Sequence, residues 1–258
     1  MNLIRKVIDR YRRYGLIQAA RNALRGFVER YGPTSFKRVM WNMEFAGGRW
    51  NHIDHTAGDC VYPVIEKYAM GQSILDLGCG AGNTSTELPF NAYGEYMGID
   101  ISDVAVEKAR KRSAETGRSM KNRFSQGDIY SYVPIGRYQV VLFRESLYYF
   151  TMSKIKTMLD RYAHFLQEGG VFIVRMGNIG VDRFIGIIEN NYDVIDRYLS
   201  EEPKAIILVF RTRRTYEHTK SKRIHAAVSR ERLAEEPFAG GKTESHRPMD
   251  DMVPAVNG

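Results

Sequence analysis

The sequence predicts an α/β protein whose core is a doubly wound, mostly parallel sheet of seven strands. Short apolar runs of strand length alternate with longer segments of helical periodicity over residues 57–210. The first run, Ile74–Leu77, ends in a glycine-rich turn that opens onto polar residues typical of a helix start. The last two runs, 192–198 and 205–210, are too close in sequence to enclose a crossover helix. We therefore expect these two runs to form an antiparallel hairpin.

The other strands and helices are predicted from apolar runs and the residues that flank them. The second strand is Tyr96–Ile99 and ends at Asp100. Ser102 is expected to cap the following helix, which stops at Gly117. The remaining predictions are strands at 123–126 and 138–143, a helix at 153–166 ended by a turn at 168–170, a strand at 171–174 and a helix at 181–190.

The turn after the first strand has the pattern of a nucleotide-type site. It reads D-x-G-x-G-x-G from Asp76 to Gly82. Glycine permits positive φ and carries no Cβ, so a ligand can lie directly against this backbone. The amides of residues 81–84 would then face an anionic group from the start of the next helix. A dinucleotide fingerprint counted from Gly78 would need glycine where Asn83 stands, and this turn also lacks the Gly-Lys-Ser/Thr of a phosphate loop.

A second signal lies at Asp100, which ends the second strand. A carboxylate there can accept hydrogen bonds from both hydroxyls of a ribose. With this residue and the turn, the sequence resembles the class I S-adenosylmethionine-dependent methyltransferases of the small-molecule type. The resemblance covers roughly residues 57–210. It implies a Rossmann-like, mostly parallel seven-stranded sheet that ends in an antiparallel hairpin, with S-adenosyl-L-methionine as the cofactor.

The resemblance also implies which residues bind the cofactor. The glycine turn would face the methionine part, with one carboxylate near the ammonium, and a second carboxylate would bind the ribose. A third carboxylate would accept the adenine amino proton, between two apolar side chains that cover the purine. The predicted set is Asp76, Gly78, Cys79, Gly80, Gly82, Asp100, Ile101, Asp128 and Ile129. The alternative for each of the three aspartates is a local role, as an acceptor for turn amides or as a helix cap.

Candidates for catalysis cluster after the fourth strand, in segment 144–149. This segment leaves the carboxyl end of the sheet, where such folds bind ligands. Glu145 is the predicted catalytic residue, as a general base or as a group that orients the acceptor, and Arg144 is a candidate for holding a substrate anion. The alternative is that Glu145 only lines the cofactor site and takes no part in catalysis. His52 and His55 are weaker rivals as bases.

We expect methyl transfer to a small molecule, with a saccharide or a lipid-linked metabolite as candidate acceptors. Segment 144–149 lacks the Asn/Asp-Pro-Pro-Tyr/Phe motif with which nucleic-acid enzymes grip a flipped base. Neither Cys60 nor Cys79 follows a proline, as a nucleophile that attacks cytosine would. The alternatives are an RNA methyltransferase, and a non-catalytic protein of the same fold that docks a membrane or a partner.

The net charge of +8 is unevenly distributed along the chain. Residues 1–30 contribute +6, residues 211–258 contribute +3, and the middle, 31–210, carries −1. Enzymes of nucleic acids usually need a basic face beside the active site. The middle segment has no positive charge to spare, so we do not expect nucleic acid as a partner. The six scattered histidines and two cysteines show no metal-ligand spacing, so we expect no metal and two reduced thiols.

Three regions are predicted along the chain. Residues 1–56 hold a basic amphipathic helix and an aromatic segment at 41–50, residues 57–211 form the methyltransferase domain, and residues 212–258 form a polar, disordered tail. The basic helix is expected to dock on the core, to lie on an anionic membrane or to bind a protein partner. The aromatic segment either closes over the ligand as a lid or seals the bottom of the sheet. We expect a cytoplasmic protein, peripheral at the membrane if the helix binds lipid.

Overall fold

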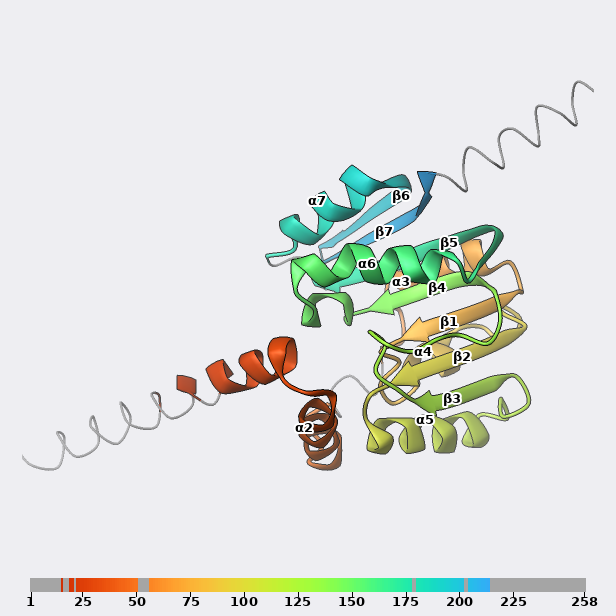
Figure 1. Ribbon diagram of the computed structural model, residues 1–258. Coiled ribbons are helices and arrows are strands. Elements are labelled where there is room, and N and C mark those ends of the chain that lie inside the picture. Colours follow the sequence, from red (N-terminus) through yellow and green to blue (C-terminus); the bar gives the residue numbers. More distant parts are fainter. Residues whose placement is uncertain are drawn as a thin grey trace, which may run out of the picture. The chain divides into compact units, whose positions relative to one another are not determined.

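The computed structural model contains a seven-stranded sheet with helices against both of its faces (Figure 1). It describes residues 22–50, 56–177, 180–201 and 204–213, together with Gly15, Ala19 and Ala20. All of these residues belong to one compact unit, Met1–Thr219.

A helix precedes each described strand except the fourth and the seventh. A helix at residues 22–31 comes before the other elements. In chain order they are α2 (Thr34–Ala46), α3 (Val61–Ala69), β1 (Ser73–Leu77), α4 (Asn83–Glu87), β2 (Glu95–Asp100), α5 (Asp103–Glu115), β3 (Asn122–Gln126), β4 (Tyr138–Arg144), the 3-10 helix η2 (Leu147–Tyr149), α6 (Met152–Ala163), β5 (Leu166–Gly177), α7 (Asp182–Asn191), β6 (Tyr192–Glu201) and β7 (Lys204–Thr212).

The strand order is β3-β2-β1-β4-β5-β7-β6. The first five strands in this order pair in parallel, whereas β7 pairs antiparallel with both β5 and β6. The predicted fold is therefore confirmed, including the hairpin. After β3 the chain passes to the other half of the sheet, so the strand order reverses between the neighbouring strands β1 and β4. A ligand crevice is expected at the carboxyl ends of these two strands.

Both faces of the sheet are buried because its central strands are apolar at nearly every position. Leu75, Leu77 and Val141 pack on one face against α6 and α7. Ile74 and Val140 point to the other face and pack against α3 and α5. Continuous apolar runs are what a parallel sheet between two helical layers requires. The two layers hold the carboxyl edge of the sheet in a fixed geometry, and that edge carries the site.

The start of β5 differs from the prediction. The helix expected at 153–166 ends at Ala163, and β5 begins at Leu166 instead of Val171. The predicted turn at 168–170 lies inside β5, where the register against β4 shifts between Tyr138 and Val140. Gly169 there has a φ of +80°. The sequence shows the two glycines, but it does not show that they form a strand irregularity instead of a loop.

Two predictions lie partly or wholly outside the described residues. Of the basic helix expected at 3–28, only its last part is described, and it is helical. Nearly all of the tail predicted at 212–258 lies outside them as well. Within the described residues, no helix combines the length and the apolar character needed to cross a membrane.

The contact of the glycine turn with α5 gives a prediction about stability. Gly82 has a φ of +79°, and a Cβ there would lie 2.8 Å from Cβ of Ala109. Gly169 has nearly the same φ, and a Cβ on that residue would meet no atom within 4 Å. Both alanine variants have to adopt positive φ, but only Gly82→Ala also overpacks a core contact. We expect Gly82→Ala to lower the free energy of unfolding by about 1–3 kcal/mol more than Gly169→Ala.

Urea denaturation of both variants measures this difference. Equal losses would mean that Gly82 is needed only for its backbone angle and not for the approach of α5.

Candidate active site

A cavity of about 420 Å³ opens at the carboxyl edge of the sheet. Seven of the ten predicted site residues line it, namely Gly78, Gly80, Asp100, Ile101, Asp128, Ile129 and Glu145. The other lining residues are Glu29, Lys37, Trp41, Phe45, Trp50, Arg144, Ser146, Tyr148, Tyr149, Phe150, Arg175 and Gly177. Asp76, Cys79 and Gly82 are not part of the lining. The structure thus gathers residues from five strand ends and from α2 around one space.

The glycine turn presents bare backbone to this cavity. Gly78 has a φ of +89° and Gly80 a φ of +53°, and both line the space. The amide of Gly78 donates to the carbonyl of Ile99 at 2.8 Å, which ties the turn to the end of β2. A Cβ on Gly78 would lie 2.6 Å from Cβ of Ser146, so no larger residue fits there. Glycine is therefore required both for the backbone angle and for the approach of the segment after β4.

Asp100 is held in place by the backbone around it. Its Oδ2 accepts from the amide of Gly80 at 2.9 Å, and its Oδ1 accepts from the amide of Ser102 at 2.9 Å. Burial raises the pKa of this carboxyl group to about 6, although the two amides oppose the shift. Each carboxylate oxygen keeps a further lone pair, because a carboxylate accepts about four hydrogen bonds. The side chain is thus a fixed acceptor at the wall of the cavity.

Asp76 lies behind the turn and not in the cavity wall. It is almost completely buried, and its Oδ2 accepts a hydrogen bond from the hydroxyl of Tyr96. Its Oδ1 is buried without a hydrogen-bond partner. Burial raises the pKa of Asp76 to about 6. A buried carboxylate oxygen without a donor is costly, so this atom is suited to a cationic or hydrogen-bonding ligand that reaches it directly or through water.

The remaining two residues of the turn pack against the protein. Cys79 is buried, and its sulfur lies against Gly98 in β2. Gly82 caps α4 and contacts Ala109 in α5. The first residues of α4 are also buried and do not line the cavity, contrary to the expectation that their amides would face a ligand. The predicted roles of Cys79 and Gly82 in cofactor binding would have to come from the backbone or from shaping the turn.

The N-terminal helix α2 is fastened to the same edge of the sheet. Thr34 donates to Oδ2 of Asp128 at 2.7 Å, while the amide of Tyr130 donates to Oδ1 at 2.9 Å. Further along α2, Arg38 pairs with Asp103 at 2.8 Å. The carbonyl of Phe45 accepts from Nζ of Lys108 at 2.7 Å. These contacts place α2 over the loops that follow β2 and β3.

Aromatic side chains from α2 and the turn after it cover the cavity. Trp41 stacks on Trp50 with 5.6 Å between ring centroids and meets the edge of Tyr149 at 5.1 Å. The ring of Phe45 lies 3.7 Å from where a Cβ on Gly80 would be. The aromatic segment therefore lies at the carboxyl edge, beside the glycine turn. A plug at the opposite end of the sheet, the alternative to a lid, is excluded.

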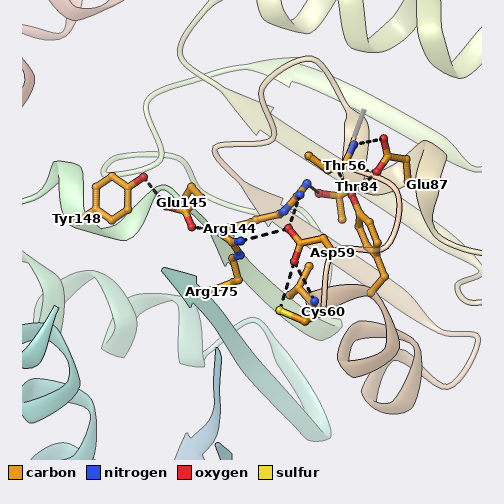
Figure 2. A network of polar contacts seen from close by, with 11 residues as sticks. Thr56, Asp59, Cys60, Thr84, Glu87, Arg144, Glu145, Tyr148 and Arg175 are labelled. Carbon is orange, nitrogen blue, oxygen red and sulfur yellow. Dashed lines mark hydrogen bonds and ion pairs between the residues drawn. The ribbon is translucent and has the colours of Figure 1, made fainter. Parts of the chain in front are cut away.

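A network of buried charges forms the wall at the ends of β4 and β5 (Figure 2). Asp59, in the segment before α3, accepts from Nη2 of Arg144 at 2.8 Å and lies 3.5 Å from Nη2 of Arg175. Burial alone would raise the pKa of Asp59, but the two guanidinium groups hold it below its ordinary value. Arg144 also lies over the ring of Tyr62 at 5.2 Å. Arg144 is thus paired within the protein, which leaves less of its charge for a substrate anion.

Glu145 belongs to this network and lines the cavity together with Arg144 and Arg175. Its Oε1 pairs with Arg175, and its Oε2 accepts from the hydroxyl of Tyr148 at 2.6 Å. Figure 2 shows this carboxylate between the two donors. The backbone of Glu145 has a φ of +55°, an uncommon angle outside glycine that often marks functional sites. A carboxylate held by a guanidinium and a hydroxyl has a fixed orientation and can accept a further hydrogen bond.

Several residues of the site were not predicted from the sequence. Arg175 carried a usable signal, since it is a charged residue inside the apolar run of β5. Glu29, Lys37 and Asp59 gave none, because only the fold brings them to this edge. His52 and His55 lie outside the described residues. Among the residues that the structure describes, no cluster of acidic, histidine or cysteine side chains is arranged for a metal ion.

Comparisons with known proteins agree with this geometry. Residues 74–170 match the family model described as a methyltransferase domain. This match covers less than half of the chain. The protein-lysine N-methyltransferase EFM4 of Saccharomyces cerevisiae is 31% identical over 131 residues, which make up 46% of this chain and 57% of that protein. The mRNA cap guanine-N(7) methyltransferase of Schizosaccharomyces pombe is 30% identical over 132 residues, which make up 46% of this chain and 37% of that protein.

The fold of this chain also occurs in solved structures. The N-methyltransferase NodS from Bradyrhizobium japonicum WM9, solved with S-adenosyl-L-homocysteine, aligns with a TM-score of 0.55 at 18% identity. The alignment covers 68% of this chain and 98% of NodS. The predicted resemblance to class I S-adenosylmethionine-dependent methyltransferases is thereby confirmed for the domain. The chain spans only 57% and 37% of the two curated relatives, which act on different acceptors.

The Asp59 network gives a prediction about stability. Asp59→Asn removes the charge that pairs with the largely buried Arg144, while Arg175 keeps its pair with Glu145. Leaving a buried charge unpaired costs about 3–5 kcal/mol. We expect the free energy of unfolding to fall by an amount in this range. Glu189→Gln is the matched control, because Glu189 pairs with Arg197 at the surface, where such pairs contribute about 1 kcal/mol or less.

Chemical denaturation at neutral pH compares the two variants. A loss at Asp59 no larger than the loss at Glu189 would show that Arg144 does not depend on this carboxylate.

Proposed function

We propose that this chain transfers a methyl group from S-adenosyl-L-methionine to a small-molecule acceptor. One observation supports this most directly: Gly78, Gly80 and Asp100 line a single cavity at the carboxyl edge of a methyltransferase domain. A bound sulfonium cofactor supplies an already activated methyl group, so the protein has mainly to align the two reactants and exclude water. The residues in and behind the cavity wall can form the hydrogen bonds and apolar contacts that such a cofactor requires.

The residues at the cofactor end of the cavity fit an adenosyl group. Asp100 is fixed by two amides and keeps lone pairs for the ribose hydroxyls. Ile101 and Ile129 provide apolar surfaces for the purine, with Asp128 as an acceptor for its amino group. The glycine turn leaves room for the methionine part along its backbone, and the unpartnered Oδ1 of Asp76 lies behind that turn.

The size and the cover of the cavity favour a small acceptor. The cavity of about 420 Å³ has to hold the cofactor as well as the acceptor, so the space left for the acceptor is small. Trp41, Phe45 and Trp50 line it from α2 and the following turn, and Tyr148 and Tyr149 line it from the segment after β4. Flat rings of this kind suit a saccharide or another ring-shaped acceptor. Arg144 and Arg175 are paired with carboxylates of the protein, so these two cations do not require an anionic acceptor.

Within this proposal, Glu145 orients the acceptor. Its two oxygens are held by Arg175 and Tyr148, so the carboxylate keeps a fixed direction. It would accept a hydrogen bond from a hydroxyl or an amine and turn the lone pair of that group toward the methyl carbon.

An RNA methyltransferase is the second candidate. The similarity to mRNA cap methyltransferases favours it. The charge of −1 on residues 31–210 argues against it, because this segment contributes nearly the whole cavity wall. Incubation with methyl-labelled cofactor and separate pools of metabolites, capped RNA and proteins distinguishes the candidates. Label in the metabolite pool supports the proposal, and label in RNA or protein alone would contradict it.

The cofactor site gives the third prediction. Asp100→Ala removes the acceptor proposed for the ribose, and a lost hydrogen bond to a charged group costs about 1–3 kcal/mol. We expect the dissociation constant for S-adenosyl-L-methionine, measured by isothermal titration calorimetry, to rise by the factor to which this loss of binding free energy corresponds. Circular dichroism checks that the variant is folded. Unchanged affinity in a folded variant would remove Asp100 from the site.

The acceptor end gives the fourth prediction. Glu145→Gln keeps the shape of the side chain but loses the ion pair with Arg175. We therefore expect turnover to fall by about tenfold or more, while cofactor affinity stays within about twofold. Tyr148→Phe removes only one neutral hydrogen bond to the same carboxylate and should lower turnover less.

Release of S-adenosyl-L-homocysteine with the labelled acceptor measures turnover in all three proteins. Full turnover of Glu145→Gln would assign Glu145 to the cavity lining alone.

A further inference from the structure

The helix at residues 22–31 is inverted relative to an ordinary surface helix. Its charged side chains Arg25 and Glu29 face inward and are largely buried, with Nε of Arg25 2.7 Å from Oε1 of Glu29. Arg25 also lies 3.2 Å from Oε1 of Glu44 and over the ring of Trp41. The outward face carries apolar side chains three and four residues apart, Leu24, Phe27 and Tyr31. A helix that faces only water would show the reverse arrangement.

The next helix carries a second apolar stripe of the same kind. The inward face of α2 holds Trp41 and Phe45, which line the cavity. Its outward face holds Phe36, Val39 and Met43, again three and four residues apart. The six outward side chains of the two helices are 58–69% exposed. Single exposed apolar residues are ordinary, but two helical stripes on consecutive helices mark an interaction surface.

The N-terminal part of the chain, which contains these stripes, is rich in positive charge. Residues 1–50 contain eleven Arg and Lys residues and three Asp and Glu residues, a net charge of +8. This equals the net charge of the whole chain, so residues 51–258 together carry none. Basic side chains beside an apolar helix face are the combination with which amphipathic helices bind anionic lipid surfaces.

We propose that the outward faces of the helix at 22–31 and of α2 dock on an anionic membrane surface. Their six apolar side chains would enter the lipid interface, while arginines and lysines from residues 1–50 contact the headgroups. A second copy of the chain fits this surface less well, because a symmetric dimer would bring two regions of +8 against each other.

The position of this surface links docking to the cavity. Glu29, Trp41 and Phe45 line the cavity from the inner faces of the two helices whose outer faces carry the stripes. A membrane bound at the outer faces therefore lies one helix layer from the acceptor end. The docking surface does not depend on methyl transfer, and it can be tested without cofactor or acceptor.

Sedimentation of the full chain with lipid vesicles tests the proposal. We expect the protein to pellet with vesicles of phosphatidylcholine and phosphatidylglycerol but not with phosphatidylcholine alone, and high salt should weaken the binding. The triple variant Leu24→Ser, Phe27→Ser, Tyr31→Ser should lower the apparent affinity on the order of tenfold or more. The matched control is Met120→Ser, Val133→Ser, Ile135→Ser, whose side chains are 63–98% exposed in the loops before β3 and β4. It should bind within about twofold of the natural chain.

Three outcomes would overturn the proposal. One is the absence of binding to anionic vesicles by the natural chain. Another is an equal loss in both triple variants, which would remove any special role from the stripes. The third is a concentration-dependent dimer in analytical ultracentrifugation that the stripe variant abolishes, since a second copy would then be the occupant of this surface.

Discussion

The site depends on the Asp100 carboxylate, which joins the ends of two strands and the start of a helix. Its Oδ2 accepts from the amide of Gly80 after β1, and its Oδ1 accepts from Ser102 at the cap of α5. These bonds fix the glycine turn relative to β2 and close the bottom of the cavity. Burial raises the pKa of the group to about 6, so the charged form is held at a cost that a ligand with hydroxyl donors would offset.

The fold could be predicted from sequence because each central strand is an apolar run bounded by glycine or by a charged residue. The hairpin β6–β7 followed from the short spacing between its two runs. Local patterns could not show that Gly169 and Gly170 belong to a shifted register, because the carbonyl of Tyr138 that packs on Gly170 comes from another strand. The seven predicted residues in the cavity wall are those that follow strand ends, where position along the chain fixes position in space.

The rest of the site comes from long-range contacts that sequence spacing does not reveal. Asp59 meets Arg144 and Arg175 because α3 and the ends of β4 and β5 pack together, and this contact sets the direction of Glu145. The N-terminal helices show the same limitation. Their amphipathic periodicity was visible, but it did not tell which face would pack on the domain. In the helix at 22–31 the ion pair of Arg25 and Glu29 faces the protein and the apolar face is exposed, because Trp41 and Glu44 of α2 receive the guanidinium.

The central claim is that one cavity at the carboxyl edge of the sheet binds the methyl donor. A crystal structure of the full chain with S-adenosyl-L-homocysteine tests it most directly. We expect the ribose hydroxyls within hydrogen-bond distance of the Asp100 carboxylate, the purine between Ile101 and Ile129, and the sulfur facing the side of the cavity that holds Glu145 and Tyr149. An adenosyl group bound elsewhere on the protein, or no binding at millimolar ligand, would contradict the account.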